Sequence, residues 1–153
     1  VKVYNRALSP ETGPYLTPDS FRDICFDRAY ALQRLMRYEE AVGQFRMYLN
    51  KANKDQHDGG RDDIDQAVYG AATCALRVEN WDEAMVVLKE YVEGSNGISG
   101  RNIALFALMQ HVEEGADEAS SYTRELLKQA LQRDPKSPFV YWLHRIVTGG
   151  GGF

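Results

Sequence analysis

The chain has 153 residues, of which 44% are hydrophobic and 26% charged, as is typical of a globular domain with its own core. The formal net charge of −4 argues against a general binder of the nucleic-acid backbone, because such proteins usually carry a basic surface. No apolar run approaches the ~20 residues that span a bilayer as a helix, and no signal peptide is visible, so we expect a cytoplasmic protein.

The two ends of the chain differ in composition from the rest. Residues 1–16 are expected to form an extended arm, because two prolines and a glycine prevent a long helix there. A helix should follow, since Thr17 can cap its N-terminus and Pro18 fits its first turn. The glycine-rich residues 148–153 are expected to form a flexible tail.

Apolar residues recur at helical spacing through the region between these ends, which predicts about seven helices. A polar loop at 53–62, a glycine-rich turn at 94–100 and Asp134-Pro135 separate some of them. Cys25 and Cys74 both fall inside helices, and we interpret them as free buried thiols. The expected helices cover about 17–35, 39–52, 63–78, 82–93, 101–114, 116–132 and 138–147.

Pairs of alanines recur along these helices at a constant offset. A small side chain lets the backbones of two antiparallel helices approach closely, and an aromatic residue, Tyr38 or Trp81, stands at the turn of the first two pairs. This pattern predicts three helical hairpins, at about 17–53, 63–93 and 100–133, with a capping helix at 138–147. The pairs are Ala29 with Ala41, Ala72 with Ala84, and Ala107 with Ala119, each 12 residues apart.

The strings YEEA at Tyr38–Ala41 and WDEA at Trp81–Ala84 are close to the turn and helix start of a known repeat. On these residues the chain resembles the tetratricopeptide repeat family over about Asp19 to Arg133. The third unit is degenerate, because Ala116 replaces the turn aromatic. The resemblance implies an all-α fold, a right-handed α-solenoid of antiparallel hairpins whose first helices line a concave groove. Such folds usually bind peptides or protein segments.

The resemblance also implies which residues face the groove. Only Arg101 among them would suit a carboxylate, so we do not expect the two-carboxylate clamp that many members of the family use. The groove is aromatic and apolar with acidic residues at one end, which favours an apolar or basic-apolar peptide or helix. The expected groove residues are Asp23, Phe26, Asp27, Tyr30, Gln66, Tyr69, Thr73, Arg101, Leu105 and Leu108.

Two features leave alternatives open. Phe26, Tyr30 and Tyr69 suit either ligand contact or packing between repeats, since aromatics serve both purposes. The helix at 101–114 has almost no polar face, so something must cover it on every side. The arm, the last helix, a second copy or a bound peptide are the candidates, and self-association or a role as accessory domain of a larger protein remain alternatives to an adaptor.

No motif indicates catalysis or a bound metal or cofactor. His57 lies among acidic residues, but their spacing does not match a calcium loop. No His is placed beside Cys25, and Ser95 lacks the strand-to-helix elbow of a hydrolase nucleophile. We therefore expect a protein that is not an enzyme and binds no cofactor, metal or nucleic acid. It should act as a protein-binding adaptor or scaffold.

Overall fold

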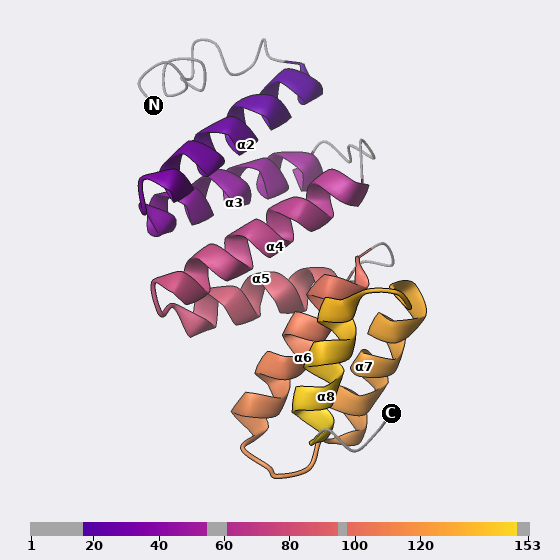
Figure 1. Cartoon of the computed structure of the whole chain (residues 1–153). Coiled ribbons are helices and arrows are strands. Elements are labelled where there is room, and N and C mark those ends of the chain that lie inside the picture. Colours follow the sequence, from indigo (N-terminus) through magenta and orange to yellow (C-terminus); the bar gives the residue numbers. More distant parts are fainter. Residues whose placement is uncertain (1–16, 55–60, 95–97, 150–153) are drawn as a thin grey trace. The chain divides into compact units, whose positions relative to one another are not determined.

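The computed structural model describes residues 17–54, 61–94 and 98–149, and all regular structure in them is α-helical (Figure 1). The all-α prediction with seven helices is therefore confirmed for these residues. None of these helices is long and apolar enough to cross a membrane. The predicted arm at 1–16 and residues 150–153 of the predicted tail lie outside the described residues. The helices are α2 (Pro18–Arg34), α3 (Tyr38–Lys54), α4 (Arg61–Arg77), α5 (Trp81–Gly94), α6 (Gly100–Glu114), α7 (Ser121–Arg133) and α8 (Pro138–Thr148).

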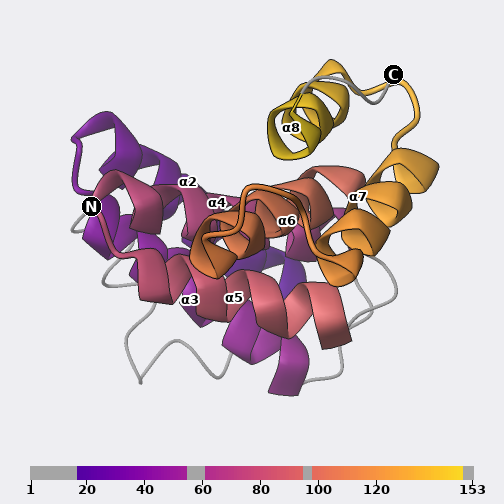
Figure 2. The same ribbon diagram turned by 90° about the horizontal axis from the view of Figure 1, so that it is seen from below.

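The chain divides into two compact units, unit 1 (Val1–Val87) and unit 2 (Leu88–Phe153). In unit 1, α3 packs against both α2 and α4; in unit 2, α6 packs against both α7 and α8. Figure 2 shows α2 and α4 on one side of unit 1 and α3 on the other. Helices that follow one another in the sequence therefore pack mostly as antiparallel neighbours.

The turn between α2 and α3 is closed by backbone hydrogen bonds. Met36 adopts a left-handed conformation with φ 58°, and its N–H donates to the carbonyl of Gln33 at 3.0 Å. The N–H of Arg37 donates to the carbonyl of Leu32 at 2.8 Å. This is the Schellman motif, which gives hydrogen-bond partners to the last carbonyls of a helix.

The turn between α4 and α5 has the same backbone geometry. Glu79 takes the place of Met36, with the same φ of 58°, and its N–H donates to the carbonyl of Leu76 at 3.1 Å. The N–H of Asn80 donates to the carbonyl of Ala75 at 2.9 Å. The two turns with matching sequences thus close in the same way.

The helix expected at 116–132 begins later than predicted. The hydroxyl of Ser120 accepts a hydrogen bond from the N–H of Thr123 at 3.2 Å and so caps the start of α7. Ala119 lies before this cap, whereas the two alanines with which it was aligned lie inside their helices. The alignment of Ala119 with them is therefore wrong. The other six helices agree with the expected ranges to within two residues at each end.

An aromatic cluster forms the centre of unit 1. Phe45 on α3 has no exposed surface, and its ring centroid lies 5.9 Å from those of Phe26 and Tyr30 on α2. The ring of Tyr48 lies 5.1 Å from that of Phe26. On the other side, a Cβ built on Gly70 of α4 would lie 2.6 Å from the Phe45 ring. The absence of a side chain at Gly70 is what lets α4 approach α3.

Helix α6 supplies the core of unit 2. Phe106 is fully buried, together with Leu127 of α7 and Leu143 of α8. The start of α6 also approaches α7 closely, because a Cβ on Gly100 would lie 2.5 Å from the carbonyl oxygen of Ala130. Of the candidates for covering the apolar helix at 101–114, the last helix does pack against it.

We predict that Met36→Gly and Glu79→Gly each stabilise the protein by about 0.5–1 kcal/mol. A left-handed conformation costs a residue with a Cβ about 1–2 kcal/mol, and the larger backbone freedom of glycine in the unfolded chain offsets part of that gain. Met36 is 77% exposed and contributes little packing. The measurement is the urea midpoint at unchanged m-value. Met36→Ala is the control, since it keeps the strain; a loss of stability in both glycine variants would contradict the turn geometry.

We predict that Gly70→Ala destabilises the protein by about 1–3 kcal/mol, because the added methyl group must displace the buried ring of Phe45. Gly43→Ala is the matched control within the same unit. Nothing lies within 4 Å of a Cβ at Gly43, so alanine should stabilise α3 by up to about 1 kcal/mol through its helix propensity. Equal effects in the two variants, measured by chemical unfolding, would argue against the close contact at Gly70.

Candidate functional site

The predicted groove residues fall on three helices. Those between Asp23 and Thr73 lie on α2 and α4 in unit 1, and the other three lie on α6 in unit 2. In unit 2, Leu105 is only 8% exposed, while Arg101 and Leu108 are half-buried. The apolar α6 residues are thus largely buried within the packing of unit 2, which leaves little of their surface for a ligand. The unit 1 residues form the better candidate for a binding surface.

Helices α2 and α4 run side by side in the same direction. Near their N-termini, the guanidinium of Arg22 lies 2.8 Å from the carboxylate of Asp63. Near their C-termini, the amide nitrogen of Gln33 donates to the sulfur of Cys74 at 2.9 Å. Between them the two helices present what we call the α2/α4 face. Its members are Asp23, Asp27 and Tyr30 of α2, and Gln66, Tyr69 and Thr73 of α4, each exposed or half-buried.

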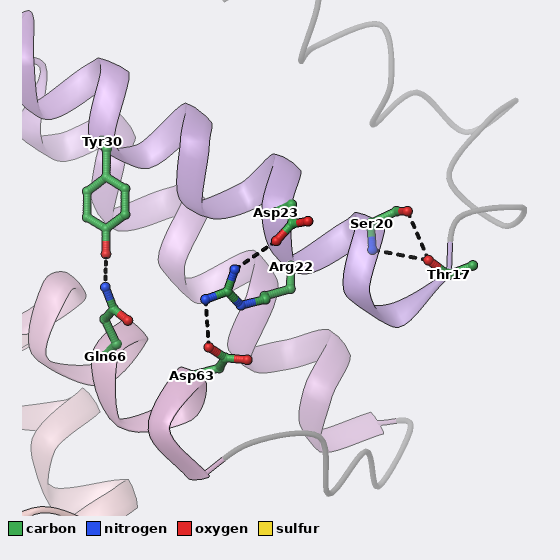
Figure 3. Close-up of polar contacts among 7 residues, drawn as sticks. All are labelled: Thr17, Ser20, Arg22, Asp23, Tyr30, Asp63 and Gln66. Carbon is green, nitrogen blue, oxygen red and sulfur yellow. Dashed lines mark hydrogen bonds and ion pairs between the residues drawn. The ribbon is translucent and has the colours of Figure 1, made fainter.

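The N-terminal end of this face is acidic, and two of its carboxylates share one cation, Arg22. Figure 3 shows Arg22 between the carboxylates of Asp23, at 2.7 Å, and Asp63. The guanidinium also lies 4.8 Å from the ring centroid of Phe26. These carboxylates raise the pKa of Arg22. Asp27, one turn further along, is exposed and makes no ion pair or hydrogen bond with any residue in the described ranges.

The aromatic residues of α2 divide between core and surface. Phe26 is 3% exposed and packs in the aromatic cluster, so its ring supports the surface from beneath. Tyr30 is half-buried, with its ring edge-on to Phe45. Its phenol oxygen accepts a hydrogen bond from the amide of Gln66 (Figure 3). Tyr30 is thus held at the surface from both sides, by its ring and by its hydroxyl.

A hollow of about 350 Å³ lies at the C-terminal end of the face. Tyr69 and Thr73 were predicted as groove residues, whereas the other four lining residues were missed. The helix period could have identified two of the missed residues, because Gln33 follows Tyr30 by one turn on α2 and Arg77 follows Thr73 by one turn on α4. The hollow is lined by Gln33, Tyr38, Tyr69, Thr73, Cys74 and Arg77.

Arg77 is the one residue of this lining with a formal charge. Its guanidinium lies 5.2 Å from the ring centroid of Tyr38, a cation–π contact, and donates to the phenol oxygen of Tyr38 at 3.4 Å. The nearby Glu40 is taken by Arg37, which donates to both of its oxygens at 2.7 and 2.6 Å. Within the described part of the chain, Arg77 pairs with no carboxylate.

The two thiols of unit 1 are free and buried. Burial raises the pKa of Cys25 to about 12. Burial also raises the pKa of Cys74, although the hydrogen bond from Gln33 and the charge of Arg77 oppose the rise. Both side chains are therefore neutral at physiological pH, which does not suit a nucleophile.

The described residues contain no group of three or more His, Cys, Asp or Glu side chains that could hold a metal ion. His57 and the residues around it, up to Gly60, lie outside the described ranges.

Comparison of the chain with models of protein families, with curated proteins and with solved structures gives no significant match.

We predict that both thiols react slowly with a thiol-specific reagent in the native protein. Burial raises the pKa of both thiols, that of Cys25 to about 12, so at pH 8 both are mostly protonated, whereas the thiolate is the reactive form. The rate of reaction with a chromogenic disulfide reagent, followed by absorbance, should be at least about tenfold lower in the native protein than in denaturant. Cys25→Ser and Cys74→Ser assign the two phases. A native thiol that reacts as fast as a free cysteine would contradict the burial described for it.

Proposed function

We propose that unit 1 is a non-catalytic protein-binding module, acting as an adaptor or scaffold, that holds a peptide or helix of a partner against the α2/α4 face. The observation that carries this proposal is the partly exposed surface that Tyr30 and Tyr69 form on neighbouring helices. Both rings are half-buried, and an unpaired carboxylate lies on one side of them and the hollow on the other. Tyrosines offer large contact areas at low cost in side-chain entropy.

The rigidity of Tyr30 adds to the argument. Its ring contacts Phe45 and its hydroxyl is bonded to Gln66, so little rotamer freedom is left to lose when a ligand binds. Partner side chains that pack on the two tyrosines would each contribute roughly 1.5–3 kcal/mol, less the cost of association. Binding in the range of about 1 μM, or −8 kcal/mol, is the expected result.

The charge of the face indicates the class of partner. Asp27 forms no ion pair with any residue in the described ranges, and Asp23 and Asp63 share the guanidinium of Arg22. Opposite charge on a partner steers association and fixes its register. An apolar segment with a basic residue opposite Asp27 therefore fits this end of the face.

A tetratricopeptide-like solenoid is part of this proposal. It is supported by the two turns at Met36 and Glu79, which have matching sequences and matching hydrogen bonds. Two stacked hairpins of this kind would place their first helices, α2 and α4, on one surface. The late start of α7 limits the regular repeats to the first two.

A second candidate function, self-association, is favoured by an apolar stripe on α8. Trp142 is 58% and Ile146 is 47% exposed, and Phe139 lies one turn before Trp142 with ring centroids 6.3 Å apart. Exposed apolar stripes of this kind mark interaction surfaces. This candidate would leave the α2/α4 face uninvolved, so variants of the two surfaces separate the two functions.

The test is selection of random dodecapeptides on the intact protein, followed by fluorescence titration of the enriched peptides. Tyr30→Ala and Tyr69→Ala should each weaken binding about tenfold, equivalent to about 1.4 kcal/mol, through lost contact area. Trp142→Ser is the control and should leave the affinity unchanged. Unchanged affinity in both tyrosine variants, or loss of affinity in Trp142→Ser alone, would exclude the α2/α4 face as the binding site.

A further inference from the structure

The hollow at the end of the α2/α4 face differs in charge from the rest of that face. Asp23, Asp27 and Asp63 place three carboxylates along its N-terminal part. None of the residues that line the hollow is acidic, and Arg77 supplies one positive charge. A ligand that lies along the face would therefore meet negative charge at one end and positive charge at the other.

The arrangement of Arg77 suits an incoming acceptor. Its guanidinium is stacked on Tyr38, so that its position is set before a ligand arrives. Guanidinium N–H groups are arranged as a fork that matches the two oxygens of a carboxylate. The phenol oxygen of Tyr38 accepts from Arg77, which leaves the hydroxyl hydrogen free to donate to another acceptor.

The other polar groups of the hollow are largely occupied by one another. The hydroxyl of Thr73 donates to the carbonyl of Tyr69 at 2.8 Å, and the amide of Gln33 donates to the sulfur of Cys74 at 2.9 Å. Glu40, two residues after Tyr38, is held in an ion pair by Arg37. Arg77 is thus the one strong donor of the hollow that lacks an anionic partner among the described residues.

We propose that the hollow binds the carboxylate of an Asp or Glu side chain of the partner segment, through Arg77 and Tyr38, and thereby fixes the direction in which the segment lies along α2 and α4. The inference rests on the proposed function of unit 1 and deepens it. The site lies one helical turn beyond the groove positions expected from the sequence. A positive contact at this end and carboxylates at the other would allow the face to bind a ligand in one orientation only.

The geometry also sets the spacing within the partner. Asp27 and Gln33 stand six residues apart on α2, which at 1.5 Å per residue is about 9 Å along the helix axis. An extended segment advances about 3.3 Å per residue. Arg77 lies three residues beyond Cys74, the contact of Gln33, so the carboxylate site extends to about 13.5 Å from Asp27. The basic residue that meets Asp27 and the acidic residue that enters the hollow should therefore lie about three to four positions apart, with apolar residues between them.

The experiment is parallel selection of random dodecapeptides on the intact wild-type chain and on Arg77→Glu. Arg34→Glu is the matched control, because Arg34 holds the place in the last turn of α2 that Arg77 holds in the last turn of α4, and it does not line the hollow. Circular dichroism checks that all three proteins are folded. Peptides from the wild type and from Arg34→Glu should carry an acidic residue about three to four positions from a basic one.

The decisive readout is rescue. A peptide selected on the wild type should bind Arg77→Glu at least about tenfold more weakly, and replacing its acidic residue with Lys should restore binding to that variant. An acidic residue enriched equally on Arg77→Glu would overturn the inference. Enriched peptides without any acidic preference would leave the proposed function standing and remove the inference. A wild type that enriches no peptide would overturn both.

Discussion

The contact between the ring of Phe45 and the bare backbone of Gly70 is the constraint on which unit 1 depends. A side chain at Gly70 would collide with a ring that Phe26 and Tyr30 already hold in place. Because glycine stands there, α4 approaches α3 closely enough for all three helices to share one aromatic core. Interiors packed at this density do not absorb an extra methyl group without cost.

The position of α4 determines what the surface can do. Because α4 packs on α3, the outer residues of α4 lie beside those of α2. The ion pair between Arg22 and Asp63 connects the two helices near their N-termini. At the other end the helices leave a hollow, bordered by Arg77 and Tyr38. The polarity of the face, acidic at its start and basic at its end, thus follows from which side chains the two helices place beside each other. Recognition of an extended segment is the function that this polarity supports best.

The sequence predicted most of the helices but less of the site. Alanine pairs at a constant offset, with an aromatic residue at the turn, helped to locate α2 to α5, because close backbone approach demands small side chains at fixed spacing. The same rule failed at Ala119, where the hydroxyl of Ser120 caps the helix and leaves the alanine outside it. The spacing of alanines does not indicate which serine will cap the helix. The sequence left open whether Phe26 contacts a ligand or packs inside, and its ring is buried, because helical spacing alone does not separate a surface position from one just beneath it. The helix period could have placed Arg77 one turn after Thr73, but its cation–π contact with Tyr38 on α3 could not be predicted from that spacing.

The most direct test of the account is a nuclear magnetic resonance titration of the ¹⁵N-labelled intact chain with a peptide selected on it. Backbone amide shifts should concentrate in α2 and α4, over Pro18–Arg34 and Arg61–Arg77, with the side-chain amides of Gln33 and Gln66 among the most affected. Those two amides flank the hollow and Tyr30, respectively. Shifts confined to α6, α7 and α8 in unit 2 would contradict the claim that unit 1 binds the partner along its α2/α4 face.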